Sequence, residues 1–219
     1  MIKIEDLQKH DWKYGINKVI NADSLAVMRL IPDNAIDLCL TDPPYGLGGR
    51  ITDGGGWAKK RGLPKGGYGW DQEVPTKEYF EEIFRISKHQ IIWGGNYFIE
   101  HLKSSRCWLM WDKVVDFTAI TNELAWTSLD KKPAIFKLMI QQDDKSVGKK
   151  QHPTQKPLEL MRWCLENYAK DCKTIIDPFA GSFTTARACK DMGFDWIAID
   201  QEEKYCKIGE KRLEQEILF

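Results

Sequence analysis

The stretch Thr174–Ser182, with the sequence TIIDPFAGS, predicts the class of fold. Its first four residues read as a short buried β-strand, and Pro-Phe-Ala-Gly-Ser then forms a tight turn. A helix is expected over Phe183–Met192, and Asp195–Ile199 is a second strand that ends in Asp200. A strand, a turn, a helix and a second strand form a parallel βαβ unit, so we expect an α/β fold.

The turn and Asp200 together predict a nucleoside site. An acidic residue at the tip of the second strand of such a unit commonly binds ribose hydroxyls, and Asp200 follows Gly181 by 19 residues. The turn lacks the three glycines of a dinucleotide site, which favours a nucleoside without phosphates. The alternative is an ordinary βαβ unit in which Asp200 caps a helix.

A second stretch, Thr41–Gly46 (TDPPYG), follows the apolar run Ala35–Leu40, which we interpret as another buried strand. Its two prolines have a fixed φ and no N–H donor, so the turn is stiff. The turn holds the carboxylate of Asp42 and the ring of Tyr45 at the carboxyl end of a strand. Open α/β sheets bind their ligands at that edge.

This turn predicts chemistry on the amino group of a nucleic-acid base. A carboxylate and a nearby carbonyl can accept both amino hydrogens, while an aromatic ring stacks on the base. Two such acceptors increase the electron density on a poorly nucleophilic nitrogen as an electrophile approaches. The alternative is a rigid turn in which Asp42 caps a helix or bonds within a loop.

Asp23 has two interpretations. It follows the short strand Lys18–Asn21 and precedes the amphipathic helix expected over Ser24–Ile31, so it is a natural N-cap. It is also an acid at the carboxyl end of a strand, where it could bind the amino group of an adenine ring. Further strands are expected with few helices between them, which predicts a partly antiparallel far side of the sheet. They are Gln90–Asn96, Cys107–Trp111, Glu123–Thr127 and Ala134–Leu138.

Two segments are expected to contact DNA. Residues 46–69 contain ten of the 17 glycines, and we interpret them either as a basic mobile loop that closes over a phosphate backbone or as a plain flexible insertion. Residues 131–151 contain six lysines and two aspartates, which favours phosphate binding over an ordinary solvated loop only modestly. The expected DNA-binding residues are Lys59, Lys60, Arg61, Lys65, Lys131 and Lys132.

Composition limits the remaining possibilities. A chain of 219 residues fits one α/β domain, and a formal net charge of zero means that DNA binding depends on local patches. The sequence has no apolar run of transmembrane length and no secretory start, so we expect a cytoplasmic protein without membrane contact. Its six cysteines form no Cys-x-x-Cys pair and are expected to be reduced thiols, and no metal site is expected.

Three motifs carry a resemblance to a known family. Asp-Pro-Pro-Tyr at 42–45, His-Pro-Thr-Gln-Lys-Pro at 152–157 and Asp-Pro-Phe-Ala-Gly-Ser at 177–182 resemble, in type and order, the β-class S-adenosylmethionine-dependent DNA amino-methyltransferases. The resemblance extends from about Lys18 to Arg212. It implies a Rossmann-like sheet of seven strands with helices on both faces, in one domain over 1–219, with the catalytic half first in the sequence.

The resemblance also implies roles for individual residues. Asp42 and the carbonyl of Pro43, in a turn that Pro44 completes, would accept the amino hydrogens of a flipped base, and Tyr45 would stack on that base. The implied S-adenosylmethionine site consists of Asp23 at the adenine, Asp200 at the ribose, Thr154 and Lys156 near the methionine carboxylate, and Asp177, Phe179, Ala180, Gly181, Ser182 and Gln201 along the cleft. An aspartate at the head of the tetrapeptide is typical of adenine-N6 enzymes, whereas serine is commoner in cytosine-N4 enzymes.

Two departures from the family pattern have consequences. The family usually has glycine where this chain has Phe183, so we expect the ring to narrow the cofactor cleft or weaken cofactor binding. Only residues 131–151 are available for target recognition, so we expect low sequence specificity or a homodimer, and a restriction enzyme as partner stays open.

We predict adenine-N6 methylation of DNA by direct in-line transfer to a flipped base. The alternatives are cytosine-N4 methylation, a non-catalytic nucleic-acid-binding protein whose cleft Phe183 blocks, and methylation of RNA or of a protein glutamine. The order of the motifs argues against the glutamine enzymes.

Overall fold

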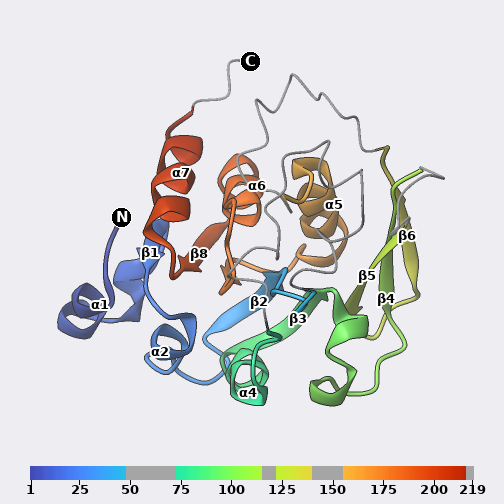
Figure 1. Cartoon of the computed structure of the whole chain (residues 1–219), viewed down its shortest axis with the longest axis horizontal. Helices are drawn as coiled ribbons and strands as arrows, with labels where there is room; N and C mark the ends of the chain where they lie inside the picture. The colour runs from blue at the N-terminus through green and yellow to red at the C-terminus, as the bar shows by residue number, and fades with distance from the viewer. Residues whose placement is uncertain (48–72, 115–121, 140–154, 216–219) are drawn as a thin grey trace.

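The computed structural model describes residues 1–47, 73–114, 122–139 and 155–215, which form one mixed sheet covered by helices on both faces (Figure 1). The strands lie in the order β1-β8-β7-β2-β3-β5-β4-β6. Their bounds are β1 Lys18–Asn21, β2 Ile36–Thr41, β3 Ser87–Trp93, β4 Trp108–Asp112, β5 Asn122–Thr127, β6 Ala134–Lys137, β7 Thr174–Asp177 and β8 Asp195–Asp200.

The Rossmann-like α/β class is confirmed, with one more strand than expected. The described residues contain eight strands because β6 pairs with β4 and adds an edge. β5 runs antiparallel to both β3 and β4, so the far side of the sheet is partly antiparallel, as its scarcity of helices predicted. All the other strand pairs of the sheet are parallel.

The helices divide between the two faces of the sheet (Figure 1). One face packs against the helices of the carboxyl half and the other against those of the amino half. On the first lie α5 Leu158–Tyr168, α6 Thr184–Met192 and α7 Glu203–Glu214; on the second lie α1 Ile4–His10, α2 Ser24–Met28 and α4 Lys77–Ile86. No helix in the described part of the chain is both long enough and apolar enough to span a membrane.

The two halves of the chain interleave in the sheet. β7 and β8 come late in the sequence, yet they lie between β1 and β2. β7 continues through α6 to β8 on one side, and β2 continues through α4 to β3 on the other. The sheet therefore has its topological switch point between β7 and β2, which is where open α/β sheets form a ligand crevice at the strand carboxyl ends.

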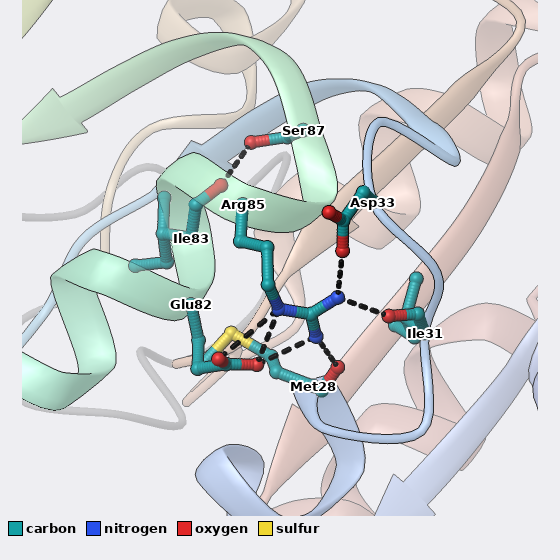
Figure 2. A network of polar contacts seen from close by, with 7 residues as sticks. All are labelled: Met28, Ile31, Asp33, Glu82, Ile83, Arg85 and Ser87. Atoms are coloured by element: carbon teal, nitrogen blue, oxygen red, sulfur yellow. Dashed lines mark hydrogen bonds and ion pairs between the residues drawn. The ribbon is translucent and has the colours of Figure 1, made fainter.

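Arg85 of α4 holds the end of α2 in place (Figure 2). Its guanidinium donates hydrogen bonds of 2.9 Å to the carbonyls of Met28 and Ile31. It also pairs with Asp33 at 2.6 Å and with Glu82 at 2.7 Å. The helix expected to run to Ile31 ends as α2 at Met28, and Arg85 satisfies two of the carbonyls exposed at that end.

Candidate active site

The catalytic turn after β2 and the glycine turn after β7 meet at the switch point. The Thr41 hydroxyl donates a 2.7 Å hydrogen bond to the Asp177 carboxylate and ties the two strand ends together. A pocket of about 380 Å³ opens there, and its walls include Asp42 and Pro44 on one side and the segment 177–182 on another. Two stretches that lie more than 130 residues apart in the chain thus share one cavity.

Asp42 is bonded from two directions by residues that the sequence had singled out. The Tyr45 hydroxyl donates to its Oδ1 at 2.5 Å, and the Lys156 ammonium donates to its Oδ2 at 2.5 Å. The Lys156 ammonium also donates to the Tyr45 hydroxyl at 3.0 Å, which closes a triangle of three side chains. Asp42, Tyr45 and Lys156 are therefore held as one unit at the rim of the pocket.

Burial and charge oppose one another in this unit. Burial raises the pKa of Asp42, while the Lys156 ammonium and the Tyr45 hydroxyl act to lower it. Burial also acts to lower the pKa of Lys156, but the carboxylates of Asp42 and Glu123 outweigh it and raise that pKa above its usual range. Lys156 is consequently a cation at neutral pH, although its side chain is only 7% exposed.

Sequence reasoning missed two members of the site, Glu123 and Lys113. Glu123, at the start of β5, contacts Lys156 at 2.9 Å and Lys113 at 2.5 Å. Burial disfavours its charge, but these two cations lower the pKa of Glu123 to about 2. The one available signal was a glutamate at the head of the apolar segment Glu123–Ser128, and nothing local indicated which lysines it would meet.

The Tyr45 ring fits closely against the segment after β3. It stacks on Tyr97 with ring centroids 4.8 Å apart and planes inclined by 17°. Gly94 has a φ of 72°, and a Cβ at that position would lie 2.1 Å from the Tyr45 ring. Glycine therefore serves both the left-handed backbone and the close approach, which gives a reason for the Gly-Gly pair in this segment.

The glycine turn forms the second wall of the pocket. Its lining residues are Asp177, Pro178, Phe179, Ala180, Gly181 and Ser182. The Asp177 carboxylate accepts the Phe179 backbone N–H at 3.1 Å as well as the Thr41 hydroxyl, and burial raises its pKa to about 6. Through these two hydrogen bonds Asp177 ties the glycine turn to the end of β2.

Asp200 both lines the pocket and holds the turn. Its Oδ2 accepts the backbone N–H of Gly181 at 2.9 Å, and its Oδ1 accepts that of Glu202 at 2.8 Å. Burial raises the pKa of Asp200 to about 6 despite these two bonds. Gln201 lines the same cavity. The N-cap of α7 is Glu202, so Asp200 is not the helix cap of the alternative interpretation, and its contact with a nucleoside stays a prediction.

Asp23 lines the pocket and also caps α2. Its Oδ1 accepts the backbone N–H of Ala26 at 2.9 Å, which confirms the cap. Its Oδ2 accepts the Tyr79 hydroxyl at 2.8 Å, so α4 contributes to the same wall. A carboxylate has about four acceptor positions, so a further donor from a ligand remains compatible with both bonds.

The expectation that Phe183 narrows the cofactor cleft is wrong. Phe183 is fully buried at the N-cap of α6, and its ring packs into the core rather than the pocket. Its φ of 58° explains why the family prefers glycine at this position. Gly209 of α7 makes room for the ring, because a Cβ there would lie 2.4 Å from it. Blockage of the cleft therefore gives no reason to favour a non-catalytic protein.

Lys131 and Lys132 lie away from the pocket. They precede β6, which runs parallel to β4, so they are at the amino edge of the sheet whereas the pocket is at the carboxyl edge. The Lys131 ammonium donates to the Asn167 carbonyl at 3.0 Å, near the end of α5. Contact of Lys131 and Lys132 with DNA stays a prediction, at a place apart from the pocket. Five other predicted residues fall outside the described part of the chain: Lys59, Lys60, Arg61, Lys65 and Thr154.

Comparison with solved structures agrees with this fold. The structure titled M1.HpyAVI–SAM complex aligns over 90% of this chain and 99% of its own chain, with a TM-score of 0.57 and 19% identity. The PvuII DNA methyltransferase, described as cytosine-N4-specific, covers 92% of this chain and 87% of its own, with a TM-score of 0.61 and 15% identity. At these identities the likeness establishes the fold alone.

Sequence relatives and a family model establish the family. The type II methyltransferase M2.DpnII of Streptococcus pneumoniae is 27% identical over 93% of this chain and 92% of its own. The type II methyltransferase M.HinfI of Haemophilus influenzae is 24% identical over 91% of this chain and 69% of its own length. A family model described as DNA methylase, for N6 and N4 methyltransferases, matches residues 92–211, which is more than half of the chain. The chain therefore belongs to the DNA methylases that methylate the amino groups of bases.

Proposed function

We propose that this protein methylates N6 of adenine in DNA, on a base flipped out of the helix. One observation carries the proposal. The partly buried carboxylate of Asp42 lines a pocket that the glycine turn and Asp200 also line. An acceptor for an amino group and a cradle for a nucleoside therefore open into one cavity, as a transfer between the two requires.

The pocket suits S-adenosyl-L-methionine, the methyl donor of this family. Its volume of about 380 Å³ falls in the range of small-molecule sites, and it combines apolar walls with convergent carboxylates. Asp200 would accept the ribose hydroxyls and Asp23 the adenine amino group, while Phe179 and Ala180 would provide apolar contact. When bound, the cofactor supplies an electrophilic methyl group.

Asp42 and the carbonyl of Pro43 would hold the two amino hydrogens of the target base. Their pull increases the electron density on the amino nitrogen, which is otherwise delocalised into the ring. Asp42 would also receive the proton that the nitrogen releases on methylation, since the loss of hydration raises the pKa of its carboxyl and makes it a better proton acceptor. Positioning and electrostatics then supply the rate without a covalent enzyme intermediate.

The aromatic segment beside Asp42 would support the flipped base. Extruding a base costs a few kcal/mol, and stacking on an aromatic ring returns about 1–3 kcal/mol. Tyr45 is the proposed platform, and Tyr97, which stacks on it and is 37% exposed, extends the aromatic surface towards solvent.

Contacts with the DNA backbone remain a separate proposal. Lys59, Lys60, Arg61 and Lys65 would bind phosphates from the glycine-rich segment 46–69, within a single domain over 1–219. Replacing Lys59, Lys60 and Arg61 by alanine should weaken DNA binding and make it less sensitive to salt. Unchanged affinity across a salt titration would remove this segment from the interface.

Identification of the methylated nucleoside tests the central proposal. Unmethylated plasmid DNA is incubated with the protein and cofactor, digested to nucleosides and analysed by mass spectrometry. We expect N6-methyladenine with the native chain, none with Asp42→Ala, and unchanged cofactor binding in that variant. N4-methylcytosine would instead establish cytosine-N4 methylation, the specificity printed for the structurally similar PvuII enzyme. Full activity of Asp42→Ala would refute the mechanism.

A further inference from the structure

Four charged side chains of alternating sign, each partly or fully buried, form a line that ends at the catalytic carboxylate. Lys113 follows β4, Glu123 begins β5, Lys156 precedes α5 and Asp42 follows β2. The successive contacts are 2.5 Å between Lys113 and Glu123, 2.9 Å between Glu123 and Lys156, and 2.5 Å between Lys156 and Asp42. The four side chains are 9%, 16%, 7% and 22% exposed in that order, so they are partly shielded from water and Asp42 is the most accessible.

We propose that Glu123 is a positioning residue for methyl transfer, which fixes the Lys156 ammonium and, through it, the carboxylate of Asp42. The Lys156 ammonium donates hydrogen bonds to Asp42 at 2.5 Å and to the Tyr45 hydroxyl at 3.0 Å, and it forms an ion pair with Glu123 at 2.9 Å. Of these three partners, Glu123 is the one outside the catalytic turn, so its charge holds the ammonium from a second element of the fold.

The charge of Glu123 has a second effect. With Lys113, Glu123, Lys156 and Asp42 all charged, the four groups sum to zero. If Glu123 were neutral, the sum beside the target base would be +1. The amino nitrogen gains positive charge as the methyl group arrives, so a surplus of positive charge at this position opposes the reaction.

Stability alone gives a weak reason for such an arrangement. Each buried charge costs several kcal/mol of desolvation, and apolar side chains of similar size often serve stability as well or better. The arrangement is explained if one of its ends has a chemical task, and one of its ends is Asp42. The inference rests on the proposed function, since it assigns Glu123 to the same reaction.

The charged and titratable groups around the site determine its pH dependence. Lys113 and Lys156 face Glu123. Asp42 interacts with Lys156, Tyr45 and Glu123, and its charge also acts on Asp177, which lines the same pocket. The negative charge of Glu123 acts to raise the pKa of Asp42, so its removal should move the acidic limb of the rate profile to lower pH.

The test is Glu123→Gln, which keeps the shape of the side chain and removes its charge. Single-turnover methylation of unmethylated plasmid DNA should slow by about 10- to 100-fold, as for loss of other orienting partners. Binding of S-adenosylmethionine, measured by calorimetry, should stay within about threefold, because Asp23, Asp200 and the glycine turn would hold the adenosine and Glu123 acts on the pocket through Lys156. The matched control is Asp191→Asn on α6, which removes the charge of a buried carboxylate that pairs with Arg162 of α5 and Arg187 of α6, and it should leave the rate unchanged at equal folding.

Two results would overturn the inference. In the first, Glu123→Gln methylates within about twofold of the native rate and the acidic limb of its pH profile does not move. In the second, the variant loses cofactor affinity to the same extent as it loses rate. If the single variant does not fold, Lys113→Met with Glu123→Gln leaves no uncompensated buried charge. That double variant should be slower than the native chain, because Lys156 has lost its anchor, and a native rate would refute the anchor. A native chain that binds cofactor but methylates no DNA would instead refute the proposed function.

Discussion

Replacing Gly94 by alanine should disable catalysis while sparing the cofactor site. A Cβ at Gly94 would lie 2.1 Å from the Tyr45 ring, whereas carbon atoms in contact are about 3.5 Å apart. The ring or the backbone must therefore move by more than about 1 Å. The Tyr45 hydroxyl donates to Asp42 over 2.5 Å, so a movement of this size breaks that bond.

The expected loss follows from this displacement. A misplacement of about 1 Å in a catalytic constellation can lower the rate by roughly 100-fold. The free energy of unfolding should fall by about 1–3 kcal/mol from overpacking, in addition to about 1 kcal/mol from the positive φ. Affinity for S-adenosylmethionine should stay near that of the native chain, since the glycine turn and Asp200 do not contact Gly94.

Gly193 provides a matched control. Its φ is 79°, close to the 72° of Gly94, and a Cβ there would meet nothing within 4 Å. Gly193→Ala therefore carries the backbone strain without the clash. Single-turnover methylation and calorimetry are measured on both variants. The reasoning is refuted if Gly94→Ala methylates within about threefold of Gly193→Ala, or if it loses cofactor binding to the same extent as activity.

Three further predictions concern the pocket and its support. Burial raises the pKa of Asp200 to about 6, and the ionised carboxylate is the form that accepts hydroxyls. Cofactor affinity measured by calorimetry should therefore increase from pH 5 to 7, and most of this pH dependence should disappear in Asp200→Asn. A flat profile for the native chain would contradict this. Arg85→Met should lower the free energy of unfolding by about 1–3 kcal/mol through loss of the bonds in Figure 2, while Lys77→Met, at an exposed pair, should leave denaturant unfolding unchanged. Gly209→Ala should destabilise the chain by about 1–3 kcal/mol, and adding Phe183→Leu should recover part of this; additive losses would exclude the contact.

Sequence reasoning succeeded where the signal was local. The glycine turn, its helix and Asp200 form a contiguous βαβ unit, and the structure contains it with β7, α6 and β8 close to the expected bounds. Asp23 was recognisable as a cap because the residues it serves follow it directly. In each case the decisive hydrogen bonds or periodicity lie within a few residues of the motif.

It failed where distant contacts decide the outcome. Phe183 was expected in the cleft because nothing nearby indicated that Gly209 would vacate space for its ring. Glu123 was overlooked because its partners are separated from it by 10 and 33 residues.

The repeated Asp-Pro dipeptide shows how position in the sheet divides structure from chemistry. β2 ends in Thr41 before Asp42-Pro43, and β7 ends in Asp177 before Pro178. Asp177 turns inward and bonds to Thr41 and the Phe179 N–H, which fixes the cradle. Asp42, one residue beyond its strand, reaches the pocket rim and Lys156 instead. Because β2 and β7 are neighbours, Asp177 aligns the glycine turn that shares the pocket with Asp42. This relation depends on strand pairing and not on the order of the motifs in the chain. A permuted sequence can therefore build the same site.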